Sequence, residues 1–94
     1  MSITGAPLLR YAIIGSGMMG LEHIRNLVEI PDVRIVGVCD PHTPSLEKAR
    51  RVLNRMEGVR YFTNHLEMLL HCQADVVVIA TPNHTHFTIA RDVL

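Results

Sequence analysis

The residues that most clearly suggest chemistry form a short glycine-rich run. The spacing Gly-x-Gly-x-x-Gly occurs in the segment Gly15-Ser16-Gly17-Met18-Met19-Gly20. Glycine at the first position permits a sharp turn, at the second it lets a pyrophosphate approach the backbone, and at the third it lets a helix pack close to a sheet. A helix that begins here would also direct free backbone N–H groups and the positive end of its dipole at the phosphates. The run predicts a phosphate-binding loop, provided that a strand precedes it and a helix follows.

An acidic residue farther along the chain strengthens this interpretation. Asp40 follows Gly20 by twenty residues, and a carboxylate there can accept hydrogen bonds from both hydroxyls of an adenosine ribose. A 2′-phosphate held against this carboxylate would cost on the order of a few kcal/mol at an effective dielectric constant of about 20. The next residues, Pro41-His42-Thr43, include no arginine, and only His42 could partly offset the repulsion. We therefore expect NAD rather than NADP as the cofactor.

Three apolar runs predict the strands that must position these residues. They occupy residues 11–14, 34–39 and 75–80, and Arg60-Tyr61-Phe62 is a shorter fourth candidate. The three runs are continuous rather than alternating, which is typical of strands covered on both faces in a parallel sheet.

Segments with helical spacing lie between these strands. The apolar residues among 21–28 share one helix face, and Pro31 is expected to stop that helix. A second helix is predicted with Thr43 as its N-cap and Pro44 at its first position, and Gly58 is placed to end it. Asn64 resembles the cap of a short third helix.

The alternation of strands and helices predicts the fold class. The order β-α-β-α-β-α-β-α indicates an α/β fold with a doubly wound parallel sheet of the Rossmann type and right-handed crossovers. The last helical pattern reaches Leu94 without a stop signal, so the sheet is expected to be incomplete at its C-terminal side. We expect residues 1–8 to be a flexible lead and residues 9–94 to be the N-terminal part of a dinucleotide-binding domain.

A second polar stretch follows the fourth predicted strand. Its sequence is Ala80-Thr81-Pro82-Asn83-His84-Thr85-His86. This strand should lie beside the first one, where the strand order reverses and where open α/β sheets bind their ligands. His84 and His86 also invite a metal interpretation, but positions i and i+2 of a helix face different ways and no further ligand follows, so we expect no metal site.

Together these three motifs resemble the Gfo/Idh/MocA oxidoreductase family, over residues 9–94. The resemblance implies that the pyrophosphate and the neighbouring ribose are lined by Gly15, Ser16, Gly17, Met18 and Met19. It implies that Asp40 holds the adenosine ribose. It also implies that the nicotinamide half of the cofactor is lined by Thr81, Pro82, Asn83 and His86.

The sequence departs from the family after its last helical pattern. In the family a further strand ends in Glu-Lys-Pro, whose lysine assists proton transfer, and a second α/β domain supplies the substrate pocket. Neither is found in these 94 residues, whose only lysine, Lys48, lies in the second predicted helix. We therefore assign no catalytic residue, expect the substrate domain to be absent from this chain, and expect the 94 residues alone to be inactive.

Composition limits the remaining function classes. The 94 residues are 48% hydrophobic and carry a formal net charge of zero, which gives no electrostatic reason to expect a nucleic acid or an anionic membrane as partner. With two cysteines and no secretory signal, a cytoplasmic protein is expected.

The leading interpretation is an NAD-dependent dehydrogenase. It would transfer a hydride between nicotinamide and a sugar, polyol or related hydroxyl compound. We expect the full-length protein to be a homo-oligomer. A non-catalytic NAD-binding sensor of the same fold is the alternative, since fold does not fix function. A methyltransferase is a third interpretation, which the spacing of the third glycine and the Thr-Pro-Asn-x-x-His stretch disfavour. The plainest alternative is that the glycines only shape a tight turn and Asp40 is a solvated loop acid.

Overall fold

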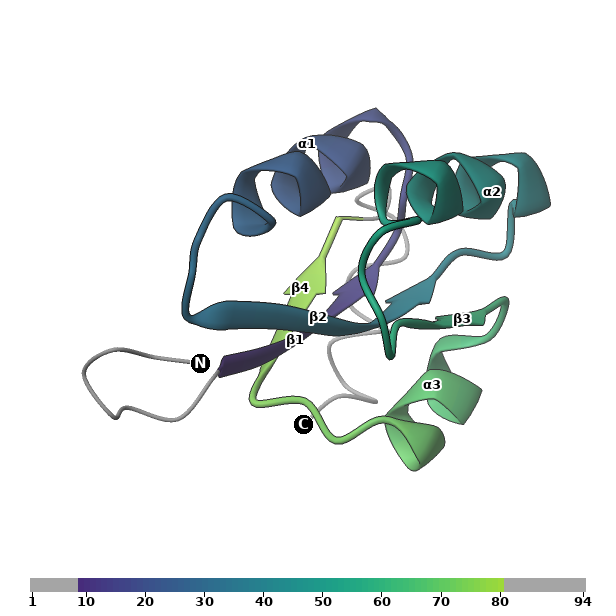
Figure 1. The fold of residues 1–94 in the computed structure, drawn as a ribbon. Coiled ribbons are helices and arrows are strands. Elements are labelled where there is room, and N and C mark those ends of the chain that lie inside the picture. The colour runs from purple at the N-terminus through teal and green to yellow at the C-terminus, as the bar shows by residue number, and fades with distance from the viewer. Residues whose placement is uncertain (1–8, 81–94) are drawn as a thin grey trace.

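The computed structural model describes residues 9–80, which form four strands and three helices (Figure 1). Residues 1–8 and 81–94 lie outside the described part. The predicted lead and the predicted last helix fall in these two segments. The elements in chain order are β1 (Leu9–Ile14), α1 (Met18–Leu27), β2 (Val33–Cys39), α2 (Thr43–Val52), β3 (Arg60–Phe62), α3 (His65–His71) and β4 (Val76–Ile79).

The strands form one parallel sheet with the order β3-β2-β1-β4. Helices α1 and α2 cover one face of the sheet and α3 lies against the other (Figure 1). The predicted α/β fold of the doubly wound type is thereby confirmed. In the register, Ile14 at the end of β1 pairs with Cys39 on β2 and with Ile79 on β4. The carboxyl ends of these three strands therefore meet at one edge of the sheet, where the chain order reverses.

Successive residues of each strand point to opposite faces of the sheet and contribute to two cores, one on each face. Ile13 and Val38 join the core beneath α1 and α2, which also contains Ile24 and Leu46. The neighbouring strand residues Ala12, Ile14 and Cys39 turn to the other face and pack with Phe62 and Met68 beneath α3. Because both faces are buried, the strands read as continuous apolar runs rather than as alternating ones.

Two helix boundaries differ from those predicted. Helix α1 ends at Leu27, well before Pro31, and the N–H groups of Val28, Glu29 and Ile30 close the last turns on carbonyls of residues 24, 26 and 27. Helix α2 ends at Val52, so the predicted stop at Gly58 is wrong: a turn intervenes, in which the N–H of Met56 donates to the carbonyl of Leu53.

The predicted start of α2 is wrong by one residue. His42, with φ −87° and ψ 102°, is the N-cap, Thr43 is the first helical residue and Pro44 the second. Proline is tolerated throughout the first helical turn, where its missing N–H has no partner to lose, so the dipeptide alone does not fix the register. The predicted cap of α3 is confirmed, because Asn64 Oδ1 accepts hydrogen bonds from the N–H groups of Leu66 and Glu67 at 2.8 and 3.2 Å.

None of the three helices in residues 9–80 combines the length and the apolar character that crossing a membrane requires.

Candidate cofactor site

The glycine run forms the turn between β1 and α1, as the motif requires. Gly15 has a φ of 98°, in the left-handed region that glycine occupies at little cost. Its N–H donates to the carbonyl of Cys39 at 2.7 Å, which extends the pairing of β1 and β2 by one residue. Gly17 then caps α1, and the N–H of Leu21 donates to the carbonyl of Gly17 at 2.8 Å.

The second and third glycines have different surroundings. A Cβ atom added at Gly20 would overlap the carbonyl group of Gly15, so this position requires glycine for close packing of α1 on the turn. A Cβ atom added at Gly17 would meet nothing within 4 Å. The backbone is therefore open at Gly17, where the motif predicts that a pyrophosphate approaches.

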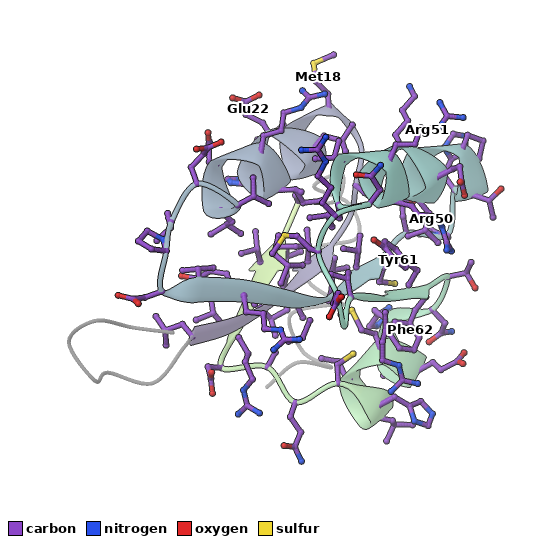
Figure 2. The ribbon with its side chains drawn as sticks, in the orientation of Figure 1. Met18, Glu22, Arg50, Arg51, Tyr61 and Phe62 are labelled. Atoms are coloured by element: carbon purple, nitrogen blue, oxygen red, sulfur yellow. The ribbon has the colours of Figure 1, made fainter. Side chains whose placement is uncertain are left out.

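The N-terminus of α1 can accept an anion. Gly17 offers no side chain to cap the first turn, and the first turn contains no acidic residue. The side chains of Met18 and Met19 are 89% and 69% exposed, and Figure 2 shows Met18 projecting away from the sheet. The ten-residue helix thus presents uncapped N–H groups and the positive end of its dipole, the arrangement that binds phosphates in nucleotide-binding folds.

Asp40 lies beside this turn and holds it. Its Oδ2 accepts hydrogen bonds from the backbone N–H of Ser16 at 2.8 Å and from Ser16 Oγ at 3.2 Å. Its Oδ1 accepts from the N–H of His42 at 2.8 Å, and its own N–H donates to the carbonyl of Phe62 at 3.0 Å. Asp40 is 8% exposed and Ser16 is fully buried. The carboxylate therefore joins the turn after β1 to the turn after β2, and it is not a solvated loop acid.

No lysine or arginine among residues 9–80 forms an ion pair with Asp40. The ion pairs recorded within residues 9–80 join Arg10 to Asp75 and Arg50 to Glu47, and neither involves Asp40. The ring of His42 is also engaged, with Nδ1 at 2.8 Å from Ser45 Oγ.

The neighbouring thiol does not provide a nucleophile. Cys39 is 1% exposed, and burial, with a smaller contribution from the charge of Asp40, raises its pKa from 9.0 to about 11. A thiol of this kind stays protonated and inert at neutral pH. Within the described residues, no group of three histidine, cysteine or acidic side chains could hold a metal ion.

The last described residue lies next to the glycine turn. The N–H of Ala80 donates to the carbonyl of Ile14 at 2.8 Å, and its Cβ would lie 3.8 Å from a Cβ placed on Gly20. The predicted site residues Thr81, Pro82, Asn83 and His86 lie outside the described residues. The structure thus brings Gly15, Ser16, Gly17, Met18, Met19 and Asp40 together at the carboxyl edge of the sheet.

Two features of the site were missed by reasoning from the sequence. Both hydrogen-bond donors of Ser16 face Asp40, where the motif predicts contacts with the cofactor. Asp40 also fixes the start of α2 through the N–H of His42. The second feature had a sequence signal, because an aspartate often accepts a hydrogen bond from the backbone two residues later. The pairing of Ser16 with Asp40 joins residues 24 positions apart, and no local sequence signal indicated it.

A separate hollow lies on the opposite face of the sheet. Its volume is about 560 Å³, and α3, the start of β4 and the loop between them line it, with Met68, Cys72, Ala74 and Asp75 among the lining residues. Because Asp75 precedes β4, the hollow reaches the amino edge of the sheet, away from the edge that carries Gly15 and Asp40.

Comparisons with known proteins agree with this geometry. The Gfo/Idh/MocA family model, described as an oxidoreductase family with an NAD-binding Rossmann fold, matches residues 9–94. Inositol 2-dehydrogenase 4 of Saccharopolyspora erythraea is 35% identical over 79 residues, covering 83% of this chain and 22% of that protein. Glycosyl hydrolase family 109 protein 1 of Shewanella sp. (strain ANA-3) is 29% identical over 93 residues, covering 93% of this chain and 20% of that protein.

A solved structure shows the same likeness. The WlbA dehydrogenase of Bordetella pertussis, crystallised with NADH and UDP-GlcNAcA, superposes with a TM-score of 0.80 at 29% identity, covering 92% of this chain and 26% of that one. The chain therefore spans about a fifth to a quarter of the length of the proteins named.

Proposed function

Because the chain belongs to the Gfo/Idh/MocA oxidoreductase family, with its NAD-binding Rossmann fold, we propose that residues 9–94 are the N-terminal part of the cofactor-binding domain of an NAD-dependent dehydrogenase. The observation that carries the proposal is that the Asp40 carboxylate connects the turn after β1 with the turn after β2 at the carboxyl edge of the sheet. There the open backbone at Gly17 and the uncapped start of α1 lie beside the buried carboxylate of Asp40.

We propose that different residues of the site bind different parts of the cofactor. The turn from Gly15 to Met19 would hold the pyrophosphate, since a phosphate group fits where a Cβ on Gly17 would meet nothing. Asp40 would hold the adenosine ribose through its carboxylate. Thr81, Pro82, Asn83 and His86 would lie along the nicotinamide half, which is supported by the position of Ala80 beside the glycine turn. Bound NAD would supply a carbon that accepts or releases hydride.

The charge at Asp40 favours NAD over NADP. A 2′-phosphate would meet a carboxylate that has no lysine or arginine partner within residues 9–80. The repulsion is on the order of a few kcal/mol, which corresponds to at least about a tenfold preference for NAD.

For the whole protein we propose hydride transfer between the nicotinamide and a hydroxyl carbon of a sugar or polyol. The support comes from the inositol dehydrogenase and from the sugar-nucleotide complex of the structural neighbour. The residues that we place at the cofactor, Gly15 to Met19 and Asp40, would position it, and we assign none of them to proton transfer with a substrate. The 94-residue chain should therefore turn over no substrate.

A glycoside hydrolase is the second candidate, favoured by the similarity to the Shewanella protein. A dehydrogenase accumulates reduced cofactor in proportion to the product, whereas hydrolysis releases a sugar with no net change in absorbance at the NADH wavelength. Assay of the whole protein with a polyol and with an aryl glycoside separates the two.

The direct test of the cofactor proposal is a titration of the chain with NADH and with NADPH, followed by the emission of the reduced nicotinamide because the chain contains no tryptophan. S-adenosylmethionine, a control of a different class, is titrated by calorimetry. We expect saturable binding of NADH, at least tenfold weaker binding of NADPH, and none of S-adenosylmethionine. Binding of S-adenosylmethionine alone, or NADPH binding tighter than NADH binding, would overturn the proposal.

A further inference from the structure

Strand β2 contains one residue that has no partner on β1. Tyr11 of β1 pairs with Ile35 of β2. The next residue of β1, Ala12, pairs with Gly37, so that Val36 is passed over. Val36 is therefore an extra residue of the kind found in a β-bulge.

The extra residue reverses the faces to which the following side chains point. Side chains alternate between the two faces of a regular strand, so residues three positions apart face opposite ways. Ile35 and Val38 nevertheless belong to the same core, beneath α1 and α2. Cys39 then belongs to the other core, beneath α3. A strand without the extra residue would turn every side chain after Ile35 to the opposite face.

The register beyond Val36 also sets the relative heights of the two turns at the carboxyl edge. There the N–H of Gly15 donates to the carbonyl of Cys39 at 2.7 Å, and the N–H of Ser16 donates to Oδ2 of Asp40 at 2.8 Å. One residue fewer in β2 would draw the turn after β2 back by about 3.3 Å, the rise of one strand residue. Both bonds between the turns therefore depend on the extra residue.

Helix α3 holds the extra residue from one face of the sheet. The thiol of Cys72 donates to the carbonyl of Val36, with Sγ 3.7 Å from the oxygen. Burial raises the pKa of the Cys72 thiol, against a smaller lowering by the charge of Arg60, so the thiol keeps its proton for this bond at neutral pH. The N–H of Cys72 donates in turn to the carbonyl of Met68 at 2.8 Å, which fixes Cys72 to the end of α3.

Gly37 provides the space that this contact needs. A Cβ atom added there would lie 3.0 Å from Cys72 Sγ and 3.2 Å from Met68 Sδ. Alanine would otherwise suit the interior of a strand better than glycine. The absence of a side chain at Gly37 therefore lets two sulfur atoms of α3 approach β2 beside Val36.

We propose that Cys72 and Gly37 are positioning residues for the cofactor edge. Together they hold Val36 in its extra position, and the resulting register brings the glycine turn level with the turn after β2. A contact on the α3 face of the sheet thereby controls the affinity for NAD at the carboxyl edge, although neither residue lies at the cofactor. Because it needs a cofactor at that edge, the inference rests on the proposed function.

The test measures NADH affinity, by the emission of the reduced nicotinamide, and unfolding in urea. Cys72→Ala removes the donor and should weaken NADH binding about threefold, as for the loss of one weak hydrogen bond. Cys72→Ser keeps a donor and should stay within about twofold of the wild type. The matched control is Leu69→Ala, since Leu69 also lies on α3 and lines the hollow. It should lower the free energy of unfolding and leave NADH affinity unchanged.

A second variant perturbs the same contact from the strand. The Cβ atom of Gly37→Ala should displace the Cys72 thiol and weaken NADH binding by at least about threefold. The double variant Gly37→Ala with Cys72→Ala should bind NADH as Cys72→Ala alone does, because the thiol is already gone and the long Met68 side chain can give way. Effects of the two substitutions that simply multiply would overturn the inference.

The ligand-free chain provides a separate readout. The amide chemical shifts of Gly15 and Ser16, whose N–H groups bond across the two turns, should change in Cys72→Ala and in Gly37→Ala but not in Leu69→Ala. Wild-type NADH affinity in either folded variant, or unchanged shifts in both, would overturn the inference. If the wild type does not bind NADH, the proposed function fails, while these shifts still decide whether Cys72 and Gly37 set the register.

Discussion

The carbonyl group of Gly15 lies where a Cβ atom on Gly20 would have to be. The first turn of α1 thus packs directly onto the turn that leaves β1, with no side chain between them. Gly17, in the same motif, has free space where its Cβ would be. Gly20 therefore allows close packing of α1, whereas Gly17 leaves room for a ligand to approach the backbone. Substituting each glycine should separate these two roles.

Gly20→Ala should destabilise the fold and abolish NADH binding together. The added methyl group must displace backbone, which costs on the order of 1–3 kcal/mol or more. Gly17→Ala, with φ at −69° and open space around it, should lower the free energy of unfolding by less than about 1 kcal/mol and still weaken NADH binding at least tenfold. Urea unfolding and NADH titration measure the two effects. Unchanged NADH affinity in a folded Gly17→Ala variant would contradict the predicted place of the pyrophosphate.

Arg50 and Arg51 are neighbours on α2 with different surroundings. The guanidinium of Arg50 lies 4.5 Å from the ring centroid of Tyr61 on β3, whereas Arg51 points away from the sheet (Figure 2). Arg50→Ala should therefore lower the free energy of unfolding by about 0.5–1 kcal/mol, and the matched variant Arg51→Ala should have almost no effect. Chemical denaturation of both variants checks this, and equal effects would show that the contact with Tyr61 contributes nothing.

Arg10 and Asp75 join the beginnings of β1 and β4. Side-chain and backbone hydrogen bonds from Arg10 lower the pKa of Asp75 below its usual 3.8. A lowered pKa in the folded state gives stability that is present above about pH 3.8 and is lost as the pH falls through the folded value. Asp75→Asn should therefore flatten the loss of Tm on acidification below pH 4, and the effect at pH 7 should be small because the pair is exposed. A Tm profile as steep as that of the wild type would refute this role of the pair.

The thiol of Cys39 should not react with alkylating reagents in the folded chain. Its raised pKa, about 11 against 9.0, favours the neutral thiol in the folded state, so stability should fall as the pH rises from about 9 towards 11. Iodoacetamide at pH 8 should modify Cys39 only after denaturation, as read by mass spectrometry. Cys39→Ala should lose this part of the alkaline slope. Because Cys72 is a second, half-buried thiol, only rapid labelling located at Cys39 in the native chain would contradict the buried environment.

The elements and their order could be predicted because their signals are local. The runs that became β1, β2 and β4 are continuous since both faces of the sheet are covered, and the side chain of Asn64 caps α3 through neighbours in sequence. The turn at Gly15 was also predictable, because the motif states the conformation that glycine allows.

Two features were missed, and only one of them depends on a contact between residues that are distant in the sequence. The N-cap of α2 is His42 rather than Thr43 because the carboxylate of Asp40 holds the N–H of His42. The buried state of Asp40 depends in turn on Ser16, 24 residues earlier. A motif can name Ser16 and Asp40 as site residues, but only the fold shows that they bond to each other.

NAD is proposed to bind at the edge formed by the glycine turn and Asp40. Backbone amide chemical shifts recorded by NMR during a titration with NAD⁺ test it in a single measurement. We expect saturable shifts that centre on the amides of Ser16 to Gly20 and of Asp40 to His42, with those of α3 (His65–His71) unchanged. Shifts that centre on α3 and the hollow beside it, or no shifts at millimolar NAD⁺, would contradict it.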